Sequence, residues 1–418
     1  MIQIISQRPL PLQKFITEFS CFFSKPLFIS FAIYISGLLL EIKRTNINSI
    51  VSKTPFASYQ KIQYFLSDSK WNSDDLNTHR LALLQANPDT EASNRGVLII
   101  DDTSCKKAKD THKTHGVAFQ YSSSDNSVIN CNVVVFSAYA DSKSRYPIDI
   151  APYFTEKDPL CKSFKVDFKS KLELAEELVK LSISRNILFS HVVFDNWYFS
   201  NDFIAFLHSE KRKWISEVEK SRLIHFRGKW VRANELLKLI PSTKFNKTVT
   251  LSYSDGSSRT FFLHSFSTFI KGIKSKLLII VSVEAFKDNQ PQNVRIFASN
   301  DIFQPPDFLL KKYARRFSVE HIFKDLKDNL AFDHFQVRSM KAIKRHWHLS
   351  ILVYSFLLIA KADSSIADAF DSKNIHTVTD ILYKIRTLNN IIAANWISNH
   401  PVDFKKYAKL HDSFKISA

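Results

Sequence analysis

The chain has 418 residues, with 58 Lys and Arg against 40 Asp and Glu, and therefore a formal net charge of +18. This length is sufficient for two or three domains, and the basic excess indicates a polyanionic partner, either nucleic acid or an anionic membrane surface. Only six glycines occur, and the closest two are Gly256 and Gly272. This spacing excludes Walker-type and dinucleotide-binding phosphate loops, which need glycines a few residues apart.

The cysteines and the N-terminal region indicate a cellular location. Cys21, Cys105, Cys131 and Cys161 form no Cys-x-x-Cys pair, so we expect free thiols in a reducing compartment rather than a zinc knuckle or a disulfide framework. No secretory signal pattern is visible at the N-terminus. The apolar stretch 26–40 is shorter than the ~20 residues needed to span a bilayer. We interpret it as a buried helix and expect a cytoplasmic protein with no membrane partner.

Chain order predicts a helical region, then an α/β region. Residues 58–85 show apolar positions at helical spacing, with a new N-cap near position 73. Strands are then expected at 97–100, at 130–140 and in the segment leading into 146–154. A charged helix at 169–186 precedes another apolar run that ends at Asp195. The order strand, strand, strand, helix, strand predicts an RNase H-like core, in which acids at strand ends meet at one sheet edge.

Between about 215 and 300 the residue pattern changes to one typical of β-strands. Residues 249–264 alternate around Ser-Asp-Gly-Ser, which predicts a hairpin, and 276–286 reads as a buried strand. Helical patterns resume at about 307 and continue through the last part of the chain. The fold class predicted is therefore α/β: a mixed sheet with flanking helices, interrupted by a β-rich insertion and bordered by helical N- and C-terminal regions.

Four polar residues near the C-terminal end share a distinctive spacing. Tyr313, Arg316, Glu320 and Lys327 read Tyr-x2-Arg-x3-Glu-x6-Lys in a stretch free of Gly and Pro. On a regular helix at about 100° per residue they share a stripe roughly 60° wide. One interpretation is a solvated face with i,i+4 charge pairs. The other is a surface that holds a phosphodiester beside a metal-binding carboxylate.

This spacing resembles the signature of bacterial insertion-sequence transposases of the DDE class that carry a β-rich insertion in the catalytic domain. The resemblance implies a DNA transposase that performs metal-dependent cut-and-paste transposition: phosphodiester hydrolysis at the element ends, then strand transfer to target DNA. It implies terminal inverted repeats and target DNA as partners and a homodimer in the DNA complex. The cofactor implied is Mg²⁺, two per active site, with Mn²⁺ as a substitute.

Three carboxylates are the expected catalytic residues and metal ligands. Asp101, Asp195 and Glu320 are hard oxygen donors of the kind that Mg²⁺ prefers, and two Mg²⁺ ions would activate the nucleophile and stabilise charge at phosphorus. Asp102 is an alternative first ligand, because adjacent strand residues point to opposite faces. The family pattern of Asp, a variable residue and Thr is matched by Asp101-Asp102-Thr103, which favours Asp101.

Basic and aromatic residues are the expected DNA contacts. By the resemblance, Tyr313, Arg316 and Lys327 would contact terminal phosphates, and Lys106 and Lys107 after the first acid would meet the DNA backbone. A solvated loop is the alternative for these two lysines. The tryptophans are interpreted as core residues, with stacking on an unpaired base as the alternative; they are Trp197, Trp214 and Trp230.

The predicted organisation has five parts: 1–92, a helical domain that binds DNA ends; 93–214, the first part of the RNase H-like core; 215–303, the β-rich insertion; 304–362, the second part of the core with the Glu-bearing helix; and 363–418, a helical C-terminal region. Two other functions stay open: a catalytically silent, transposase-derived DNA-binding protein, and a stand-alone RNase H-like nuclease. The sequence also leaves open whether a DNA hairpin intermediate forms.

Overall fold

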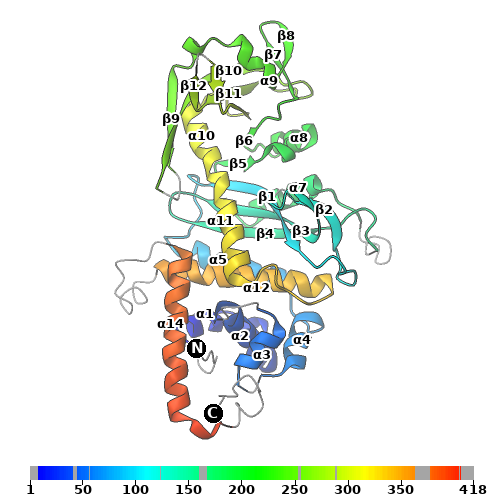
Figure 1. Cartoon of the computed structure of the whole chain (residues 1–418), viewed down its shortest axis with the longest axis vertical. Coiled ribbons are helices and arrows are strands. Elements are labelled where there is room, and N and C mark those ends of the chain that lie inside the picture. The colour runs from blue at the N-terminus through cyan, green and yellow to red at the C-terminus, as the bar shows by residue number, and fades with distance from the viewer. Residues whose placement is uncertain are drawn as a thin grey trace.

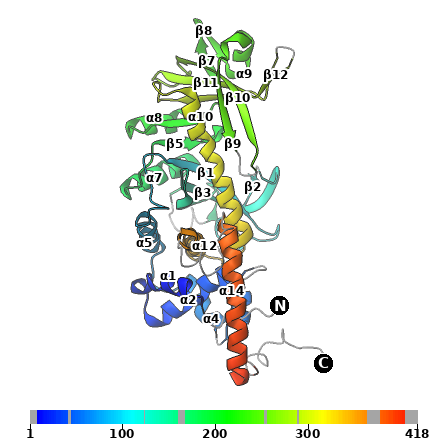
Figure 2. The same ribbon diagram turned by 90° about the vertical axis from the view of Figure 1, so that its left-hand side faces the viewer.

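The computed structural model describes residues 8–40, 45–55, 57–122, 124–159, 167–252, 256–287, 290–362, 377–403 and 405. The described chain is elongated, and its parts follow one another along the long axis (Figure 1). The β-rich segment lies at one end, the helices of the N-terminal region at the other, and a mixed sheet between them. The view in Figure 2 shows the same order.

The central sheet begins with three antiparallel strands, β1 (Val97–Lys106), β3 (Ser127–Ala140) and β4 (Arg145–Tyr153). β5 (His191–Phe194) pairs parallel to β1, and β6 (Trp214–Glu217) pairs parallel to β5. The resulting order β4-β3-β1-β5-β6 is that of an RNase H-like core. This confirms the predicted fold class. β2 (Ala118–Ser122), which extends the edge of β3, was not predicted from the sequence.

Helices cover both faces of this sheet. α7 (Lys171–Ser184) packs on β3 and β4 and contacts α8 (Asn201–Ser209). On the other face lie α10 (Pro306–Ala314) and α11 (Ser318–Lys324), and Figure 2 shows the strands between them and α7. α12 (Met340–Ala362) packs on β4 and lies below the sheet in both views. The α7 start is specified by a capping box between Ser170 and Glu173.

The helix that carries the Tyr-Arg-Glu-Lys motif is not regular. α10 is followed by a 3₁₀ turn (Arg315–Phe317), and α11 by a π-helical turn (Asp325–Asn329). These turns have fewer and more residues per turn than an α-helix. The four motif residues therefore do not keep the single stripe expected of a regular helix.

The β-rich segment continues the core sheet. β14 (Arg295–Ser299) pairs with β6 and is followed in the sheet by β11 (Leu277–Val283), β10 (Ser258–Thr268) and β9 (Lys247–Ser252). The expected strands are present, and 253–255 at the expected hairpin turn lie outside the described residues. Smaller elements are β7 (Leu223–Phe226), β8 (Lys229–Arg232), α9 (Ala233–Leu236), β12 (Ala285–Lys287) and β13 (Gln290–Gln292), with 3₁₀ turns at Leu237–Leu239 and Ser242–Lys244.

The N-terminal helices are α1 (Leu10–Thr17), α2 (Lys25–Leu40), α3 (Ile47–Lys53), α4 (Tyr59–Ser67) and α5 (Ser73–Gln85), with a 3₁₀ turn at Ser20–Phe22. Most of them pack on α12, as does α14 (Val378–Asn399). α2 is the expected buried helix: ten of its residues are buried. No helix in the described part of the chain is long and apolar enough to cross a membrane.

Buried polar residues join this helical part to the core. Arg80 on α5 is 1% exposed and donates to the carbonyls of Pro147 and Ile148 on β4 at 2.9 and 3.0 Å. His346 on α12 hydrogen-bonds the Tyr34 hydroxyl of α2 at 2.7 Å. The described cysteines, Cys21, Cys105 and Cys131, are free thiols, and Cys161 lies outside the described residues.

Candidate active site

Two strand ends bring the first two predicted acids together. Ile100 of β1 lies opposite Phe194 of β5 as the last parallel pair, and Asp101 and Asp195 are the next residues of the two chains. Parallel neighbouring strands place equivalent residues side by side at one edge of a sheet. The register therefore sets the two carboxylates next to each other, although 93 residues of sequence separate them.

Asp101 and Asp102 meet different partners, as strand alternation requires. The Asp101 carboxylate accepts from the Arg316 guanidinium at 2.9 Å, on the side of α11. Asp102 accepts from Lys171 of α7 at 2.7 Å and from the Tyr198 hydroxyl at 2.9 Å. Asp101 thus faces the helix that carries Glu320, whereas Asp102 is held by the residues of the opposite face.

Asp195 is fixed by the backbone that follows it. Its carboxylate accepts from the amides of Trp197 at 3.0 Å and Tyr198 at 3.3 Å, as the N-cap of the 3₁₀ turn Asn196–Tyr198. This local cap orients the side chain without help from distant residues.

Arg316 and Glu320 complete the cluster from the motif helix. One Arg316 nitrogen reaches Asp101 and the other lies 3.4 Å from Glu320. The Arg316 side chain is 12% exposed, whereas that of Glu320 is 58% exposed. The guanidinium therefore bridges two of the three predicted acids, and Glu320 stays accessible from solvent.

The surroundings shift the proton affinities of these groups. Burial raises the pKa of Asp101 to about 7, with added repulsion from Asp195 and Asp102 and partial compensation by Arg316. Burial also raises the pKa of Asp195. Burial acts to lower the pKa of Arg316, but the combined attraction of Tyr313, Asp101, Asp195 and Glu320 raises it above its usual value. Arg316 is consequently the main counter-charge for a carboxylate group that is otherwise costly to ionise.

These side chains line one pocket of about 690 Å³. The pocket includes Asp101, Asp102, Asp195, Arg316, Glu320 and Lys327 of the predicted site, together with Lys171, Lys324, Asp328 and Trp197. Of the predicted DNA contacts, Tyr313, Lys106 and Lys107 are absent from its lining. A pocket lined by five acids and four cationic side chains suits an anionic ligand that is bound together with cations.

Tyr313 lies in the core. Its side chain is 2% exposed, packs edge-on against Phe297 at 4.8 Å, and has a buried hydroxyl with no hydrogen-bond partner among the described residues. Burial raises the pKa of this hydroxyl to about 12. A phosphate contact by Tyr313 stays a prediction; in this structure the ring packs against Phe297, with the Arg295 guanidinium 5.7 Å from its centre.

The predicted lysine contacts have structural partners. Lys107 donates to the carbonyls of Asp333 and Phe335 at 2.8 and 3.2 Å, and Lys327 donates to the carbonyl of Ser104 at 2.8 Å. Lys106 is exposed and pairs with Asp125 at 3.1 Å. Lys327 thus ties the motif helix to β1 at the pocket, while Lys107 ties the end of β1 to a distant loop.

The three tryptophans take different positions. Trp214 is fully buried, as expected for a core residue. Trp197 is 55% exposed at the pocket, with the Lys171 ammonium 5.1 Å from its ring, and Trp230 is 48% exposed in the β-rich segment. Core packing thus describes only Trp214.

The donor set suits a hard divalent cation by its chemistry, because Asp101, Asp195 and Glu320 supply carboxylate oxygens. Within the described ranges, however, no group of three or more His, Cys, Asp or Glu side chains is close enough to hold a metal ion. Arg316 lies between Asp101 and Glu320. The acids converge on one pocket, but a cation can join them only after this guanidinium moves.

Sequence reasoning missed Lys171 and Tyr198, which hold Asp102. Lys171 is the first residue of α7, directly after the capping Ser170, and Tyr198 lies three residues after Asp195. A Ser-x-x-Glu capping pattern at 170–173 was visible in the sequence and could have placed Lys171 at a helix start beside the sheet.

Family models match most of the site. The model described as "DDE superfamily endonuclease" matches residues 19–235, just over half of the chain, and the model described as "Transposase DDE domain" matches residues 169–356. No curated protein matches. Among solved structures, the NurA nuclease from Sulfolobus solfataricus is 12% identical, with 59% of this chain and 82% of that chain covered and a TM-score of 0.25. On the evidence of the family models and of the acid cluster at the RNase H-like sheet edge, the chain belongs to the DDE superfamily of endonucleases.

Proposed function

We propose that this protein is a DNA transposase that cuts the ends of its own element and joins them to target DNA. The observation that carries the proposal is the convergence of Asp101, Asp195 and Glu320, from two strand ends and one helix, on a single pocket that also contains Arg316 and Lys327. Three carboxylates with adjacent cations are the minimum that metal-dependent phosphodiester chemistry asks of a protein. The transposase family model, which includes two of the three acids, supports the same reading.

Each residue has a part in this proposal. Asp101, Asp195 and Glu320 would hold Mg²⁺, with Mn²⁺ as a substitute. Bound there, two such ions would activate the attacking water or hydroxyl and neutralise charge at phosphorus. Arg316 would leave Asp101 and pair with a DNA phosphate. Lys327, farther along the motif helix, would pair with another phosphate. Asp102 would remain with Lys171 and Tyr198, where it orients the β1 end.

The reaction has two stages. Water attacks the phosphodiester at the element end, the bond from phosphorus to the 3′ oxygen breaks, and that oxygen takes a proton to become a free 3′-OH. The 3′-OH then attacks a target phosphodiester and displaces another 3′ oxygen. We further propose that two chains act on two paired ends, that the helical residues 1–92 engage the terminal repeats, and that the β-rich residues 215–303 form the insertion of the catalytic domain.

The test uses the purified chain, Mg²⁺ and a duplex carrying the DNA end that flanks its own gene. Wild type is compared with Glu320→Ala, and Glu156→Ala serves as a matched control because Glu156 is exposed and lies outside the pocket. We expect metal-dependent cutting by wild type and by the control. The Glu320→Ala variant should bind the duplex without cutting it.

The same assay separates the alternatives. Cutting of any duplex, without need of a specific end and without joining to a target, indicates a stand-alone nuclease. End-specific binding with no cutting by wild type indicates a silent DNA-binding protein. If Glu320→Ala cut the duplex at the wild-type rate, Glu320 would not be a catalytic residue and the proposed triad would be wrong.

A further inference from the structure

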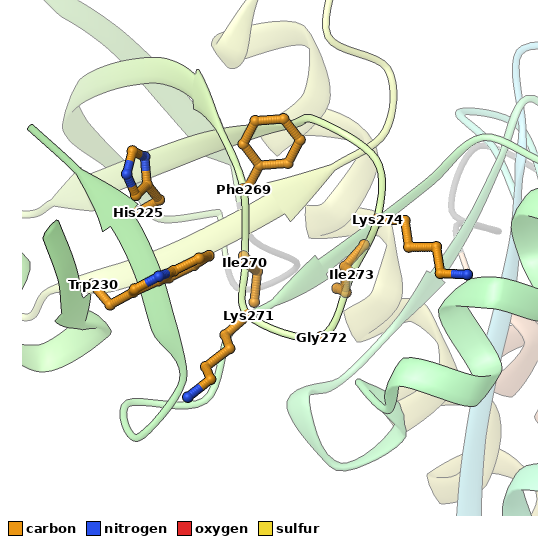
Figure 3. Close-up of a pocket in the computed structure, with 8 residues that line it drawn as sticks. All are labelled: His225, Trp230, Phe269, Ile270, Lys271, Gly272, Ile273 and Lys274. Atoms are coloured by element: carbon orange, nitrogen blue, oxygen red, sulfur yellow. The ribbon is translucent and has the colours of Figure 1, made fainter. Parts of the chain in front are cut away.

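Two pockets outside the active site differ in the chemistry of their linings. One, of about 620 Å³, lies in the β-rich segment, where Figure 3 shows the rings of His225, Trp230 and Phe269 beside it. The other, of about 170 Å³, is bordered by the turn between β3 and β4 and by residues of α11, α12 and α14. We call it the turn pocket. It is smaller than the roughly 300 Å³ at which sites for drug-sized ligands begin, so it suits an ion of a few atoms.

Three cationic side chains line the turn pocket: Lys143 from the turn, Arg145 from the start of β4 and Lys361 from the end of α12. The charged ends of Arg145 and Lys361 form no ion pair or hydrogen bond with any residue that the structure describes. The Lys143 ammonium makes one long contact, of 3.4 Å, to the carbonyl of Pro88. These charges are therefore available to a ligand.

Asp141 is the one acid among the described lining residues, and its carboxylate is occupied within the turn. One oxygen accepts from the amides of Lys143 at 2.7 Å and Ser144 at 2.8 Å, and the other accepts from the Tyr139 hydroxyl at 2.9 Å. These bonds fix the turn before any ligand binds. Three cations and one acid leave the lining with a net positive charge, which excludes a metal cation and favours an anion.

Two further acids act close to the turn pocket without lining it. Asp325 is attracted by Arg145 and accepts from the Thr379 hydroxyl at 3.4 Å. Asp380 caps α14 by accepting from the amide of Thr377 at 2.7 Å. Both carboxylates thus have partners of their own, and Asp325 offsets only part of the charge of Arg145.

Ser144 supplies an independent indication of a ligand. Its side chain lines the turn pocket and is 8% exposed, and its buried hydroxyl has no hydrogen-bond partner among the described residues. A buried hydroxyl without a partner costs free energy. A small ligand with acceptor oxygens would remove this cost by accepting the hydrogen bond, and the neighbouring cations would bind its negative charge.

We propose that the turn pocket binds a phosphate group, held by the charges of Lys143, Arg145 and Lys361 and by a hydrogen bond donated by Ser144. A free phosphate ion and a phosphate of a DNA backbone share this chemistry. Ser318, two residues before Glu320, also lines the pocket, whereas Glu320 does not. The site is thus distinct from the active-site pocket, and the inference goes beyond the proposed function because it requires neither a metal nor cutting of DNA.

The experiment measures binding of inorganic phosphate to the full chain by calorimetry and by thermal unfolding, without divalent metal. Chloride at the same ionic strength reports the general effect of salt. The variants are Ser144→Ala, which removes a neutral hydroxyl, and Arg145→Gln, which removes a charge. Lys157→Gln is the matched control, because Lys157 is exposed and lies outside the turn pocket.

We expect Ser144→Ala and Arg145→Gln each to weaken phosphate binding by about tenfold, since each removes a charge-assisted hydrogen bond or an ion pair with the phosphate. Lys157→Gln should bind phosphate as wild type does. Without phosphate, Ser144→Ala should unfold at the same temperature as wild type or higher, because it removes an unsatisfied hydroxyl. With phosphate, its unfolding temperature should rise less than that of wild type.

A fluorescent duplex distinguishes the two sources of phosphate. If the turn pocket takes a backbone phosphate, Ser144→Ala and Arg145→Gln should also weaken duplex binding, and inorganic phosphate should displace the duplex from wild type more effectively than chloride does. If it takes the free ion, the two variants should bind the duplex as Lys157→Gln does and lose affinity for inorganic phosphate alone.

Two results would overturn the proposal. One is that Ser144→Ala and Arg145→Gln bind both inorganic phosphate and the duplex as tightly as Lys157→Gln. The other is that Arg145→Gln weakens binding while Ser144→Ala does not, because this pattern indicates a general effect of surface charge and not a ligand in the pocket. Since the readout is binding without metal, a failure to observe cutting in the Glu320 assay leaves this test unaffected.

Discussion

The Arg316 guanidinium lies 2.9 Å from the Asp101 carboxylate and bridges it to Glu320 at 3.4 Å. Arg316 therefore occupies the space between two of the acids that a divalent cation would join. The same side chain is a member of the Tyr-Arg-Glu-Lys motif and a predicted phosphate contact. Cation binding and phosphate binding should accordingly both depend on the release of one ion pair.

Removal of this guanidinium should strengthen cation binding in the absence of DNA. Arg316→Gln takes a positive charge away from Asp101, Asp195 and Glu320, and we expect Mn²⁺ to bind about tenfold more tightly, which corresponds to about 1.4 kcal/mol. Calorimetry or electron paramagnetic resonance with Mn²⁺ measures this. Lys324→Gln is the control, since it removes a charge from the same pocket but from an exposed residue. Weaker Mn²⁺ binding by Arg316→Gln than by Lys324→Gln would contradict the expected competition between the Arg316 guanidinium and the cation for the carboxylates.

Substitutions of the two adjacent acids, Asp101 and Asp102, should have different effects. Asp101→Asn should abolish Mn²⁺ binding, because Asp101 faces Glu320 across Arg316. Asp102→Asn should retain Mn²⁺ binding and reduce the free energy of unfolding by about 1 kcal/mol, since the hydrogen bond from Tyr198 can persist while the pair with Lys171 is lost. Calorimetry and urea unfolding of both variants test this. The reverse pattern would make Asp102 the first ligand.

Tyr313 should tolerate loss of its hydroxyl but not of its ring. The hydroxyl is buried without a hydrogen-bond partner in the described structure, so Tyr313→Phe should leave the free energy of unfolding unchanged or raise it by up to about 1 kcal/mol. Tyr313→Ala should lower it by about 3–5 kcal/mol through the cavity it leaves. Urea unfolding measures both changes. If Tyr313→Phe also weakens binding to the element end, the hydroxyl contacts DNA in the complex; a marked loss of stability would contradict its placement in the core.

His346 should make the protein less stable in acid. Burial lowers the pKa of His346 from 6.5 to about 4, and its two ring nitrogens already contact the Tyr34 hydroxyl and the Ala331 carbonyl. The unfolded chain therefore binds a proton that the folded chain does not between these pH values. Neutral His346 therefore contributes about 3 kcal/mol to the free energy of unfolding above pH 6.5, and this contribution is lost as the pH falls towards 4.

Urea unfolding at several pH values from 7.5 to 4 tests this effect. His346→Gln should lose less stability than wild type over the interval, whereas His112→Gln, at an exposed position, should follow wild type. If the free energy of unfolding fell equally with pH in His346→Gln and in wild type, the His346 imidazole would not contribute to the pH dependence.

Local patterns in the sequence were sufficient to predict the main strands and the first helix of the core. The apolar run at 97–100, the long strand at 130–140 and the capped helix at 169–186 appear as β1, β3 and α7, because strand and helix periods and capping residues act over a few neighbours. The Tyr-Arg-Glu-Lys spacing likewise pointed to Glu320 and Arg316, which line the pocket with both strand-end acids. β2 and β6 lacked such a signal, since each is short, with five residues in β2 and four in β6.

Tertiary structure decided what each motif residue touches. A regular helix predicts Tyr313 on the polar stripe, yet the 3₁₀ turn at Arg315–Phe317 and packing on Phe297 place it in the core. Lys107, for which a DNA contact stays a prediction, binds carbonyls more than 200 residues away in this structure. The sequence by itself determined which residue types stand at which strand and helix ends. Only the fold decided that Asp101 faces Arg316 while Asp102 faces Lys171, because side-chain partners from distant segments depend on how the sheet and its two helical layers pack.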